Sequence, residues 1–256
     1  MKKEIKLLPV IGNKPEAKQY WEELLALGVK EDYENPDAIL APGGDGWILR
    51  TERDYYKSGI PIIGIGFGTR NFLLNRTLRD PKKLVDALER NEWVGFEMQG
   101  MQVYMETGGN TLEGIAFNDV YIKSTDPTGV VYLQLDTVEY PNKKVDGDGI
   151  IIATPQGSTA YNRTAGGTIL PLGSKQWTVT GICTNQKLHA TINHQEVIIR
   201  KLRGDIVVVT DNKVHYGFQG LREYKIETVR IVPSEYSVRI LFDPNENFEQ
   251  RRYNEE

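Results

Sequence analysis

The sequence predicts a protein of two domains: a Rossmann-like α/β domain over residues 1–95 and an all-β domain over residues 96–240. In the first part, apolar runs of strand type alternate with segments of helical periodicity, which is the pattern of a parallel sheet. In the second part, short alternating segments follow one another without a convincing amphipathic helix. The last residues, 241–256, are a polar tail that either forms a short helix or frays.

The α/β part begins with an apolar strand that Pro9 makes less regular. A helix with an apolar stripe follows and can end at Gly28. A later helix has Asp80 as its expected N-cap and Pro81 at its first helical position. The expected strands are residues 4–11, 37–42 and 60–66, and the expected helices are residues 15–27, 47–57 and 80–90.

The β part consists of runs in which apolar and polar residues alternate, separated by turn residues. We expect strands within residues 101–107, 114–124, 130–140, 149–155, 177–183, 196–202, 205–211, 225–232 and 237–243. The chain shows no internal repeat.

Composition excludes several classes of protein. The chain has 256 residues, of which 39% are hydrophobic and 26% charged, as in ordinary globular proteins. A net charge of -4 argues against nucleic acid as a bulk electrostatic partner. No apolar run reaches the ~20 residues of a membrane helix. Cys183 is the sole cysteine, so an intrachain disulfide is excluded, and we expect a cytoplasmic protein.

A glycine-rich turn separates the second expected strand from the second expected helix. It reads Pro-Gly-Gly-Asp-Gly over residues 42–46. Glycines let a ligand approach the main chain, and a helix start offers free N–H groups, which suits phosphate. Because Asp45 would repel phosphate, we expect it to bind an accompanying cation or to take a proton from an attacking hydroxyl. A tight turn with a surface acid is the alternative.

A second motif is more informative: DGDGIIIATPQGSTAYNRTAGG, residues 146–167. A buried strand, Gly149 to Ala153, runs into a stretch rich in hydroxyls, which can form a hydrogen-bonding floor for a polar ligand. Tyr161 can stack on a base or a ribose. A plain hydroxyl-rich turn would explain a short run of small polar residues, but this run continues to residue 167. The hydroxyl residues at the start of this floor are Thr154, Ser158 and Thr159.

These motifs resemble those of the NAD kinase family. The Gly-Gly-Asp-Gly of residues 43–46, the Phe-Asn-Asp-Val of residues 117–120 and the second motif stand in the family's order and spacing. GGDG alone is shared with diacylglycerol kinases and phosphofructokinases, whereas TPQGSTAY is far more specific. The resemblance covers nearly the whole chain and implies an NAD kinase-like fold of two domains. It implies transfer of the γ-phosphate of ATP, or of polyphosphate, to the adenosine 2′-hydroxyl of NAD.

The resemblance also implies roles for single residues. Asp45 would be the general base toward the 2′-hydroxyl. Asn118 and Asp119 stand where the family has an Asn-Glu pair that holds the adenine and nicotinamide ends of NAD. Asp148 would contact the nicotinamide-side ribose or amide. The loop would be shaped by Gly43, Gly44 and Gly46, and the dinucleotide pocket would be lined by Thr159, Ala160, Tyr161 and Thr164.

The resemblance implies Mg²⁺ bridging the phosphates of ATP, with no metal site formed by protein side chains. We expect the small molecules NAD and ATP as partners, no nucleic acid and no membrane. We expect the chain to assemble as a homodimer or homotetramer.

Several positions depart from the family pattern. Gly66 and Phe67 replace residues that are often polar or basic, and Asp146 stands where many bacterial members carry an arginine or lysine. Trp47 follows the glycine turn where a small polar residue is usual, and it either packs in the core or narrows the donor side of the loop. Arg50 either faces the phosphates or forms an exposed salt bridge.

Two other functions fit parts of the sequence. A dinucleotide-binding sensor or regulator would keep the pocket and lose efficient phosphoryl transfer, but it would have no need of Asp45. A lipid or sugar kinase would share the glycine turn, but not TPQGSTAY, and it would be expected to carry a basic segment facing the membrane.

Overall fold

Packing divides the protein into two compact units. The computed structural model describes residues 5–215, 218–219, 222–223 and 225–254. One unit is Met1–Met98 with Tyr236–Glu256, and the other is Gln99–Glu235. The first unit ends close to the predicted limit at residue 95. The predicted limit at residue 240 falls inside it, because the last part of strand β18 packs there.

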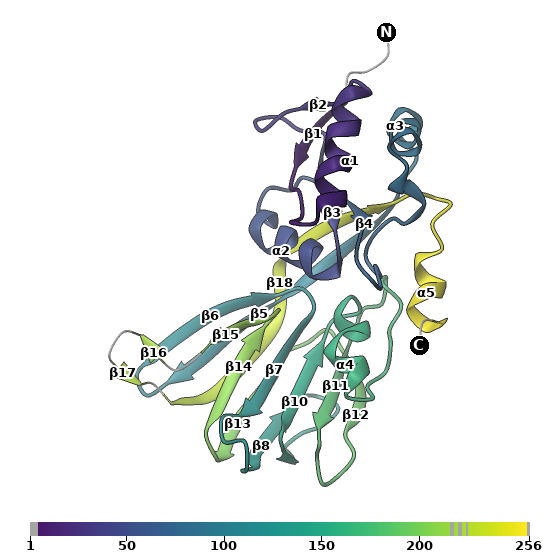
Figure 1. Cartoon of the computed structure of the whole chain (residues 1–256). Coiled ribbons are helices and arrows are strands. Elements are labelled where there is room, and N and C mark those ends of the chain that lie inside the picture. Colours follow the sequence, from purple (N-terminus) through teal and green to yellow (C-terminus); the bar gives the residue numbers. More distant parts are fainter. Residues whose placement is uncertain (1–4, 216–217, 220–221, 224, 255–256) are drawn as a thin grey trace. The chain divides into compact units, whose positions relative to one another are not determined.

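The first unit is built on a parallel sheet in the strand order β2-β1-β3-β4-β18 (Figure 1). All residues of β3 and β4 are buried, as expected for parallel strands that are covered on both faces. The strands are β1 (Lys6–Pro9), β2 (Lys30–Glu31), β3 (Ala38–Gly43), β4 (Ile62–Gly66) and the end of β18 (Ile226–Phe242).

The helices of this unit confirm the predicted α/β pattern. Helix α1 buries Ala17, Tyr20 and Leu24 and packs beside α3, and their apolar residues share one core with the sheet. The Asp80 side chain caps α3 by accepting a hydrogen bond from the amide of Lys82, as predicted. No helix among the described residues is long and apolar enough to cross a membrane. The helices are α1 (Pro15–Ala26), α2 (Asp45–Tyr55), α3 (Pro81–Arg90), α5 (Phe248–Asn254) and the 3₁₀ turn η1 (Thr77–Arg79).

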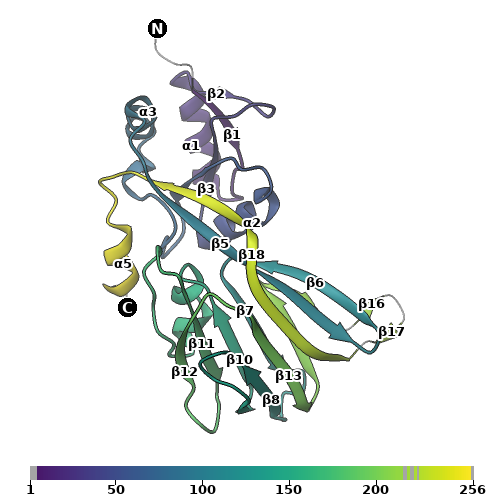
Figure 2. The same cartoon turned by 180° about the vertical axis from the view of Figure 1, so that it is seen from behind.

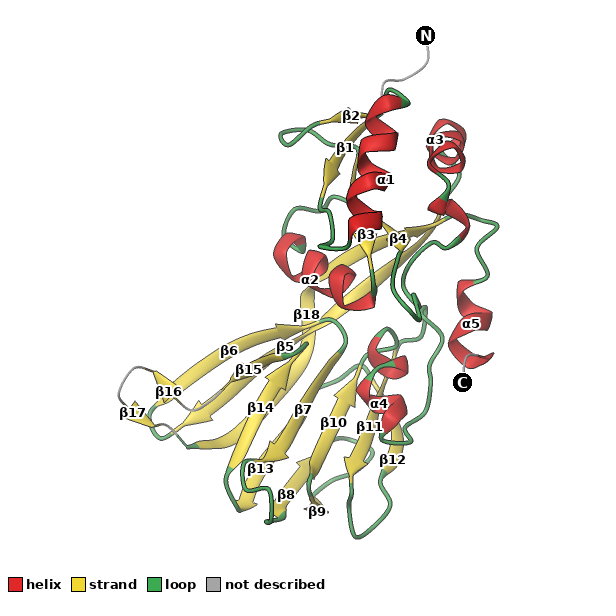
Figure 3. Cartoon of the chain, viewed as in Figure 1, coloured by secondary structure: helices red, strands yellow, loops and turns green. Residues whose placement is uncertain are grey.

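The second unit contains an antiparallel sheet in the order β12-β11-β10-β7-β14-β15. Figure 3 shows that strands dominate this unit and that its labelled helix, α4 (Tyr161–Thr164), is short. The strands of this sheet are β7 (Asp119–Ser124), β10 (Gly149–Ala153), β11 (Gln176–Ile182), β12 (His189–Asn193), β14 (Ile206–Thr210) and β15 (Lys213–His215).

Further strands of the second unit cover the inner face of this sheet. One apolar core, with Trp177 fully buried in it, takes residues from both sets of strands. The all-β prediction for this part of the chain is confirmed. The covering strands are β5 (Val94–Thr107), β6 (Asn110–Ala116), β8 (Val131–Asp136), β9 (Lys143–Gly147), β13 (Val197–Arg203) and the first part of β18.

Strand β18 is the element in which the sequence pattern and the structure differ most. Two separate strands were expected over residues 225–232 and 237–243, but the chain runs as one strand of 17 residues (Figure 2). Its first part pairs with β13 in antiparallel fashion and its end pairs with β4 in parallel. The tail beyond it forms α5, which is the helical alternative expected for residues 241–256.

Candidate active site

The glycine turn lies at the carboxyl end of β3, the edge at which parallel sheets bind their ligands. Gly44 is the N-cap of α2, and no side chain caps the helix. The amide of Trp47 already donates to the carbonyl of Gly44 at 2.8 Å, whereas the amides of Asp45 and Gly46 have no intrahelical acceptor and add to the positive end of the helix dipole.

Glycine occupies the three positions of the turn for different physical reasons. A Cβ on Gly43 would lie 2.7 Å from the side chain of Trp47, so this position accommodates the indole. A Cβ on Gly44 would lie 3.3 Å from the backbone of Gly68. Only at Gly46 would a Cβ meet open space. Close packing thus explains the first two glycines, and Gly46 is the position where a ligand has room.

Asp45 is the first residue of α2, and its carboxylate turns toward the segment that follows β4. Its Oδ1 accepts a hydrogen bond from the amide of Leu73 at 3.0 Å. Burial raises the pKa of Asp45, while the backbone amides of Leu73, Asn71 and Phe72 and the charge of Arg251 oppose that rise. A carboxyl with a raised pKa holds a proton more strongly, as a general base that works near neutral pH must.

Trp47 and Arg50 lie on the first turns of α2. The indole Nε1 of Trp47 donates to the carbonyl of Val10 at 2.8 Å. Of the two expectations for Trp47, this bond favours packing within the protein. The Arg50 guanidinium lies 5.4 Å from the indole ring centre and 3.6 Å from the carboxylate of Asp54. The structure thus places Arg50 in an exposed ion pair, and a role of Arg50 toward phosphate stays a prediction.

The departures at Gly66 and Phe67 have packing reasons. A Cβ on Gly66 would lie 2.9 Å from the side chain of Asn71, which itself adopts the left-handed backbone conformation with a φ of 56°. The ring of Phe67 packs edge-on against Tyr20 with the ring centres 5.4 Å apart. The amide of Phe67 donates to the carbonyl of Gly43 at 2.6 Å, which joins this loop to the glycine turn.

In the second unit, the two other motifs lie next to each other. Strand β7 pairs with β10 so that Asp119 lies opposite Ala153. Just beyond this pair, the amide of Thr154 donates to the carbonyl of Asn118 at 2.9 Å. A Cβ on Gly157 would lie 2.0 Å from that same carbonyl oxygen, so only glycine fits there. The structure thus brings the Phe-Asn-Asp-Val and Thr-Pro-Gln-Gly-Ser motifs together.

Asn118 and Asp119 are both buried polar residues. Asn118 is 8% exposed, and its side-chain Oδ1 has no hydrogen-bond partner among the described residues. Asp119 is 5% exposed, and no described residue donates a hydrogen bond to its carboxylate. Burial, together with the charge of Asp211, raises the pKa of Asp119 to about 7. Because buried polar groups are rarely left unpaired, these two side chains are suited to a polar ligand.

Asp211 orients this pair, and sequence reasoning did not select it. Its carboxylate accepts hydrogen bonds from the amides of Phe117 at 2.5 Å, Asn118 at 2.7 Å and Asp119 at 3.2 Å. Asp211 and Asn212 both have positive φ, 46° and 67°. The stretch Thr-Asp-Asn-Lys-Val-His over residues 210–215 is only loosely similar to an Asp-Gly pair of the resembled family, and an Asp-Asn pair after an apolar run is also typical of an ordinary turn.

The raised pKa of Asp119 gives a prediction for stability. A carboxyl whose pKa is higher in the folded state than in the unfolded state stabilises the fold below its unfolded pKa. That stabilisation is lost as the pH rises from 3.8 to about 7. We therefore expect the change in the free energy of unfolding caused by Asp119→Asn to be more stabilising at pH 8 than at pH 5. Urea unfolding of the ligand-free protein at both pH values measures this difference.

The exposed Asp205 provides the control, since Asp205→Asn should leave the pH dependence as it is in wild type. Equal effects of Asp119→Asn at the two pH values would contradict the assignment.

The hydroxyls expected to form a floor for a ligand are engaged within the protein. Each of them donates to a backbone carbonyl nearby: Thr154 Oγ1 to Phe117 at 2.6 Å, Ser158 Oγ to Pro155 at 2.7 Å and Thr159 Oγ1 to Gln156 at 3.4 Å. These bonds fix the turn that follows β10. Contacts of the three hydroxyls with a ligand stay a prediction.

Asn162 is a second polar residue that sequence reasoning missed. It is fully buried, and its Nδ2 donates to the carbonyls of Ser158 at 3.0 Å and Thr168 at 2.9 Å. Its Oδ1 accepts from the hydroxyls of Thr178 and Thr180. Asn162 therefore ties the turn to β11 and holds Tyr161, its neighbour, at the start of α4.

Tyr161 forms an aromatic corner on the second unit. Its ring packs edge-on against Tyr121 with the ring centres 5.1 Å apart, and Lys123 Nζ lies 5.9 Å from its centre. Ala160 is the N-cap of α4, and Thr164 is exposed at the end of this short helix. The half-buried ring of Tyr161 thus has a cation beside it, and stacking on a ligand stays a prediction.

Asp148 lies apart from the other predicted residues of this unit. It precedes β10, whose far end carries Ala153 and Thr154. At ~3.3 Å of rise per strand residue, Asp148 and Thr154 are about 20 Å apart along the strand. Asp148 is exposed, and its contact with the nicotinamide-side ribose or amide stays a prediction. Asp146, nearby, accepts a hydrogen bond from the side chain of Asn185.

Among the residues that the structure describes, no group of three or more His, Cys, Asp or Glu side chains could hold a metal ion.

Two family models match the chain. The model of the ATP-NAD kinase N-terminal domain matches residues 7–93, and that of the ATP-NAD kinase C-terminal domain matches residues 117–242. An NAD kinase of Xylella fastidiosa is 31% identical over 244 residues, which are 92% of this chain and 89% of that protein. An NAD kinase of Rickettsia bellii is 29% identical over 237 residues, which are 90% of this chain and 89% of that protein.

Solved structures share the fold. A yeast NADH kinase complexed with NADH superposes with a TM-score of 0.82 at 16% identity, over 98% of this chain and 86% of that one. An NAD kinase from Archaeoglobus fulgidus in complex with ATP superposes with a TM-score of 0.71 at 21% identity, over 96% of each chain. At such identities these two likenesses concern the fold alone.

Proposed function

Because the chain belongs to the NAD kinase family, we propose that it transfers the γ-phosphoryl group of ATP to the adenosine 2′-hydroxyl of NAD, with Asp45 as general base. NAD and ATP are its substrates, and NADP is its product. The observation that carries the role of Asp45 is a half-buried carboxylate at the start of α2, held by the amide of Leu73 and next to the open position at Gly46.

The chemistry of the transfer fits this carboxylate. A ribose hydroxyl is a poor nucleophile at neutral pH, so a base within hydrogen-bond reach lowers the barrier. Asp45 takes the proton of the 2′-hydroxyl as its oxygen forms a bond to the γ-phosphorus. The bond between that phosphorus and the bridging oxygen breaks, and ADP leaves. The bond from Leu73 to Oδ1 holds the carboxylate in one orientation for this step.

The start of α2 provides the phosphate subsite in this proposal. Free amides and the positive end of the helix dipole stabilise the negative charge of the phosphates. Mg²⁺ would be held by the phosphates of ATP, as is general for phosphoryl transfer from ATP. It would neutralise negative charge on the transferred group.

Asn118 and Asp119 hold the acceptor dinucleotide. The unpartnered Oδ1 of Asn118 can accept a hydrogen bond from an amino group, and its amide nitrogen can donate to a ring nitrogen or carbonyl. Asp119, when ionised, can accept from an amino or hydroxyl group. Because Tyr161 lies in the same unit with a half-buried ring, we assign it to stacking on the ligand.

We expect Asn118→Ala to raise the KM for NAD several-fold and to leave the KM for ATP nearly unchanged. Loss of one hydrogen bond to a neutral partner costs about 0.5–1.5 kcal/mol. Steady-state kinetics with each substrate varied in turn measure the two constants. Asn185→Ala is the control, because the Asn185 side chain makes an exposed hydrogen bond to the carboxylate of Asp146. Equal weakening toward NAD and ATP would show that Asn118 is structural.

We also propose a location and an assembly state for the enzyme. We assign it to the cytoplasm, where a protein with Cys183 as its sole cysteine needs no disulfide. We expect a homodimer or homotetramer; light scattering coupled to size-exclusion chromatography measures the mass.

Incubation of the purified protein with NAD, ATP and Mg²⁺, followed by an assay for NADP, tests the proposed activity. We expect NADP to accumulate with time and enzyme concentration. Tight binding of NAD without formation of NADP would favour the sensor or regulator that keeps only the pocket.

A further inference from the structure

The orientation of Asp45 depends on the segment of residues 71–77, which follows β4. Leu73 donates its amide to Asp45 Oδ1, and the amides of Asn71 and Phe72 act on the same carboxylate. This segment is neither helix nor strand until η1 begins at Thr77. Its position must therefore be fixed by contacts with other parts of the unit.

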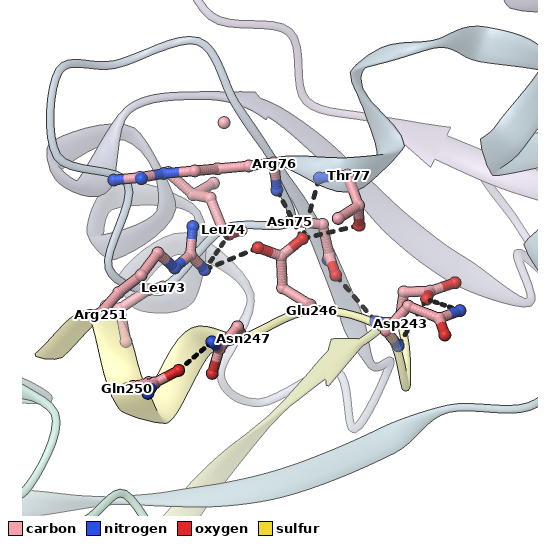
Figure 4. A network of polar contacts seen from close by, with 12 residues as sticks. Leu73, Leu74, Asn75, Arg76, Thr77, Asp243, Glu246, Asn247, Gln250 and Arg251 are labelled. Atoms are coloured by element: carbon pink, nitrogen blue, oxygen red, sulfur yellow. Dashed lines mark hydrogen bonds and ion pairs between the residues drawn. The ribbon is translucent and has the colours of Figure 1, made fainter.

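The chain beyond β18 makes these contacts through Glu246 (Figure 4). Its Oε2 accepts hydrogen bonds from the amide of Arg76 at 2.8 Å and from the amide and hydroxyl of Thr77 at 2.9 Å and 2.7 Å. Glu246 is buried, so these bonds are shielded from water. Charge-assisted bonds of this kind are among the stronger ones in proteins.

Arg251 of α5 completes the contact. Its Nη2 lies 3.0 Å from Glu246 Oε1 and donates to the carbonyl of Leu74 at 3.0 Å, next to the residue that bonds Asp45 (Figure 4). The side chain of Arg251 is 11% exposed and that of Glu246 is 3% exposed. The pair thus binds the segment at two points: Arg251 bonds to Leu74, and Glu246 bonds to Arg76 and Thr77.

Asn75, between these points, fixes the segment to both neighbouring strands. Its Nδ2 donates to the carbonyls of Gly64 in β4 and Leu241 in β18, both at 3.0 Å. Its Oδ1 accepts from the amide of Asp243 at 2.8 Å (Figure 4). The segment that orients Asp45 is therefore held throughout by the C-terminal part of the chain.

We propose that Glu246 and Arg251 are positioning residues for phosphoryl transfer, which act on Asp45 through the segment of residues 71–77. This inference rests on the proposed role of Asp45 as the general base. Displacement of a catalytic group by ~1 Å can cost about 10²-fold in rate. The charged groups that act on Asp45 from α5 are Arg251 and Arg252, so loss of Arg251 also removes a charge that favours the ionised carboxylate.

The test is Arg251→Met, which keeps an unbranched apolar stem and removes the charge and the donors. We expect kcat to fall roughly 10-fold to 10²-fold with the KM for NAD nearly unchanged. The acidic limb of the pH profile of kcat should move to higher pH, because Asp45 loses both aligned amides and a nearby cation. Arg251→Lys should recover part of kcat, since a lysine keeps the charge.

Two further variants separate positioning from folding. Glu246→Gln keeps the shape of the side chain and an oxygen that can accept from the amides, but it loses the ion pair with Arg251. We expect it to lower kcat in the same way as Arg251→Met. It therefore provides the test if Arg251→Met does not fold. Arg239→Met is the control: Arg239 belongs to the same unit, is 58% exposed and lies 3.8 Å from Glu97. We expect wild-type kcat and pH profile for it.

The titration of Asp45, followed by carboxyl ¹³C NMR, gives a readout that needs no turnover. Its pKa should rise in Arg251→Met and not in Arg239→Met. A folded Arg251→Met protein with unchanged kcat, pH profile and Asp45 titration would overturn the positioning role. An inactive wild-type protein would overturn the proposed function instead. The NMR titration would still show whether the loss of Arg251 changes the pKa of Asp45.

Discussion

Replacement of Asp45 by asparagine is expected to lower kcat for NADP formation by ~10²–10⁴, the range that general bases contribute. The amide is isosteric with the carboxylate and can keep the bond from Leu73, but it cannot take the proton of a hydroxyl. Binding of NAD and the fold should be nearly unaffected. Initial rates at saturating NAD and ATP measure the effect, and calorimetric titration with NAD measures binding.

Asp54→Asn is the matched control for this variant. Asp54 lies on the same helix, is 51% exposed and pairs only with Arg50 among the described residues. It should retain wild-type turnover. Asp45→Asn with nearly full turnover would contradict the catalytic role, and a loss shared by both variants would indicate damage to α2.

Asp211→Ala is expected to have the largest effect on stability among the variants discussed. The substitution leaves three amides, those of Phe117, Asn118 and Asp119, without their carboxylate acceptor in a buried place. Each unsatisfied buried group costs about 1–3 kcal/mol. Relief of the repulsion between Asp211 and Asp119 offsets part of this loss. We therefore expect a net loss of roughly 3 kcal/mol in the free energy of unfolding, measured by urea denaturation.

Two comparisons sharpen this result. Asp211→Asn keeps an acceptor oxygen and suits the positive φ of this position, so it should lose less stability. Burial, the larger cause of the raised pKa of Asp119, stays in this variant, but the charge of Asp211 is removed, so Asp119 should titrate at lower pH than in wild type. Asp205→Ala removes only an exposed ion pair with Lys225 at 3.6 Å and should change stability little. Similar losses for Asp211→Ala and Asp205→Ala would contradict the account.

The sequence was sufficient for the parts of the fold that depend on local pattern. The alternation of strands and helices, the Asp80 cap and the buried strand at Gly149–Ala153 follow from periodicity and composition, and the structure confirms them. The continuity of β18 was not predictable, because the polar residues between its two apolar runs read as a turn. Only pairing with distant strands keeps such residues extended.

The candidate site was predictable to the extent that its residues belong to compact motifs. Asp45, Asn118 and Tyr161 each stand in a distinctive stretch of sequence. Asp211 and Glu246 do not, since a carboxylate that accepts backbone amides from a segment ~100 or more residues away leaves no local trace. The packing reason for Gly43, close approach of Trp47, was equally hidden, because a glycine for a ligand and a glycine for a side chain look the same.

The most direct test of the central claim is the stoichiometry and position of phosphoryl transfer. The purified protein is given ATP and Mg²⁺ with either NAD or an NAD analogue that lacks the adenosine 2′-hydroxyl, and ADP and phosphorylated dinucleotide are quantified over time. We predict equal amounts of ADP and NADP from NAD, and no phosphorylated product from the analogue. Phosphorylation of the analogue, or binding of NAD without any NADP, would contradict transfer to the 2′-hydroxyl by this protein.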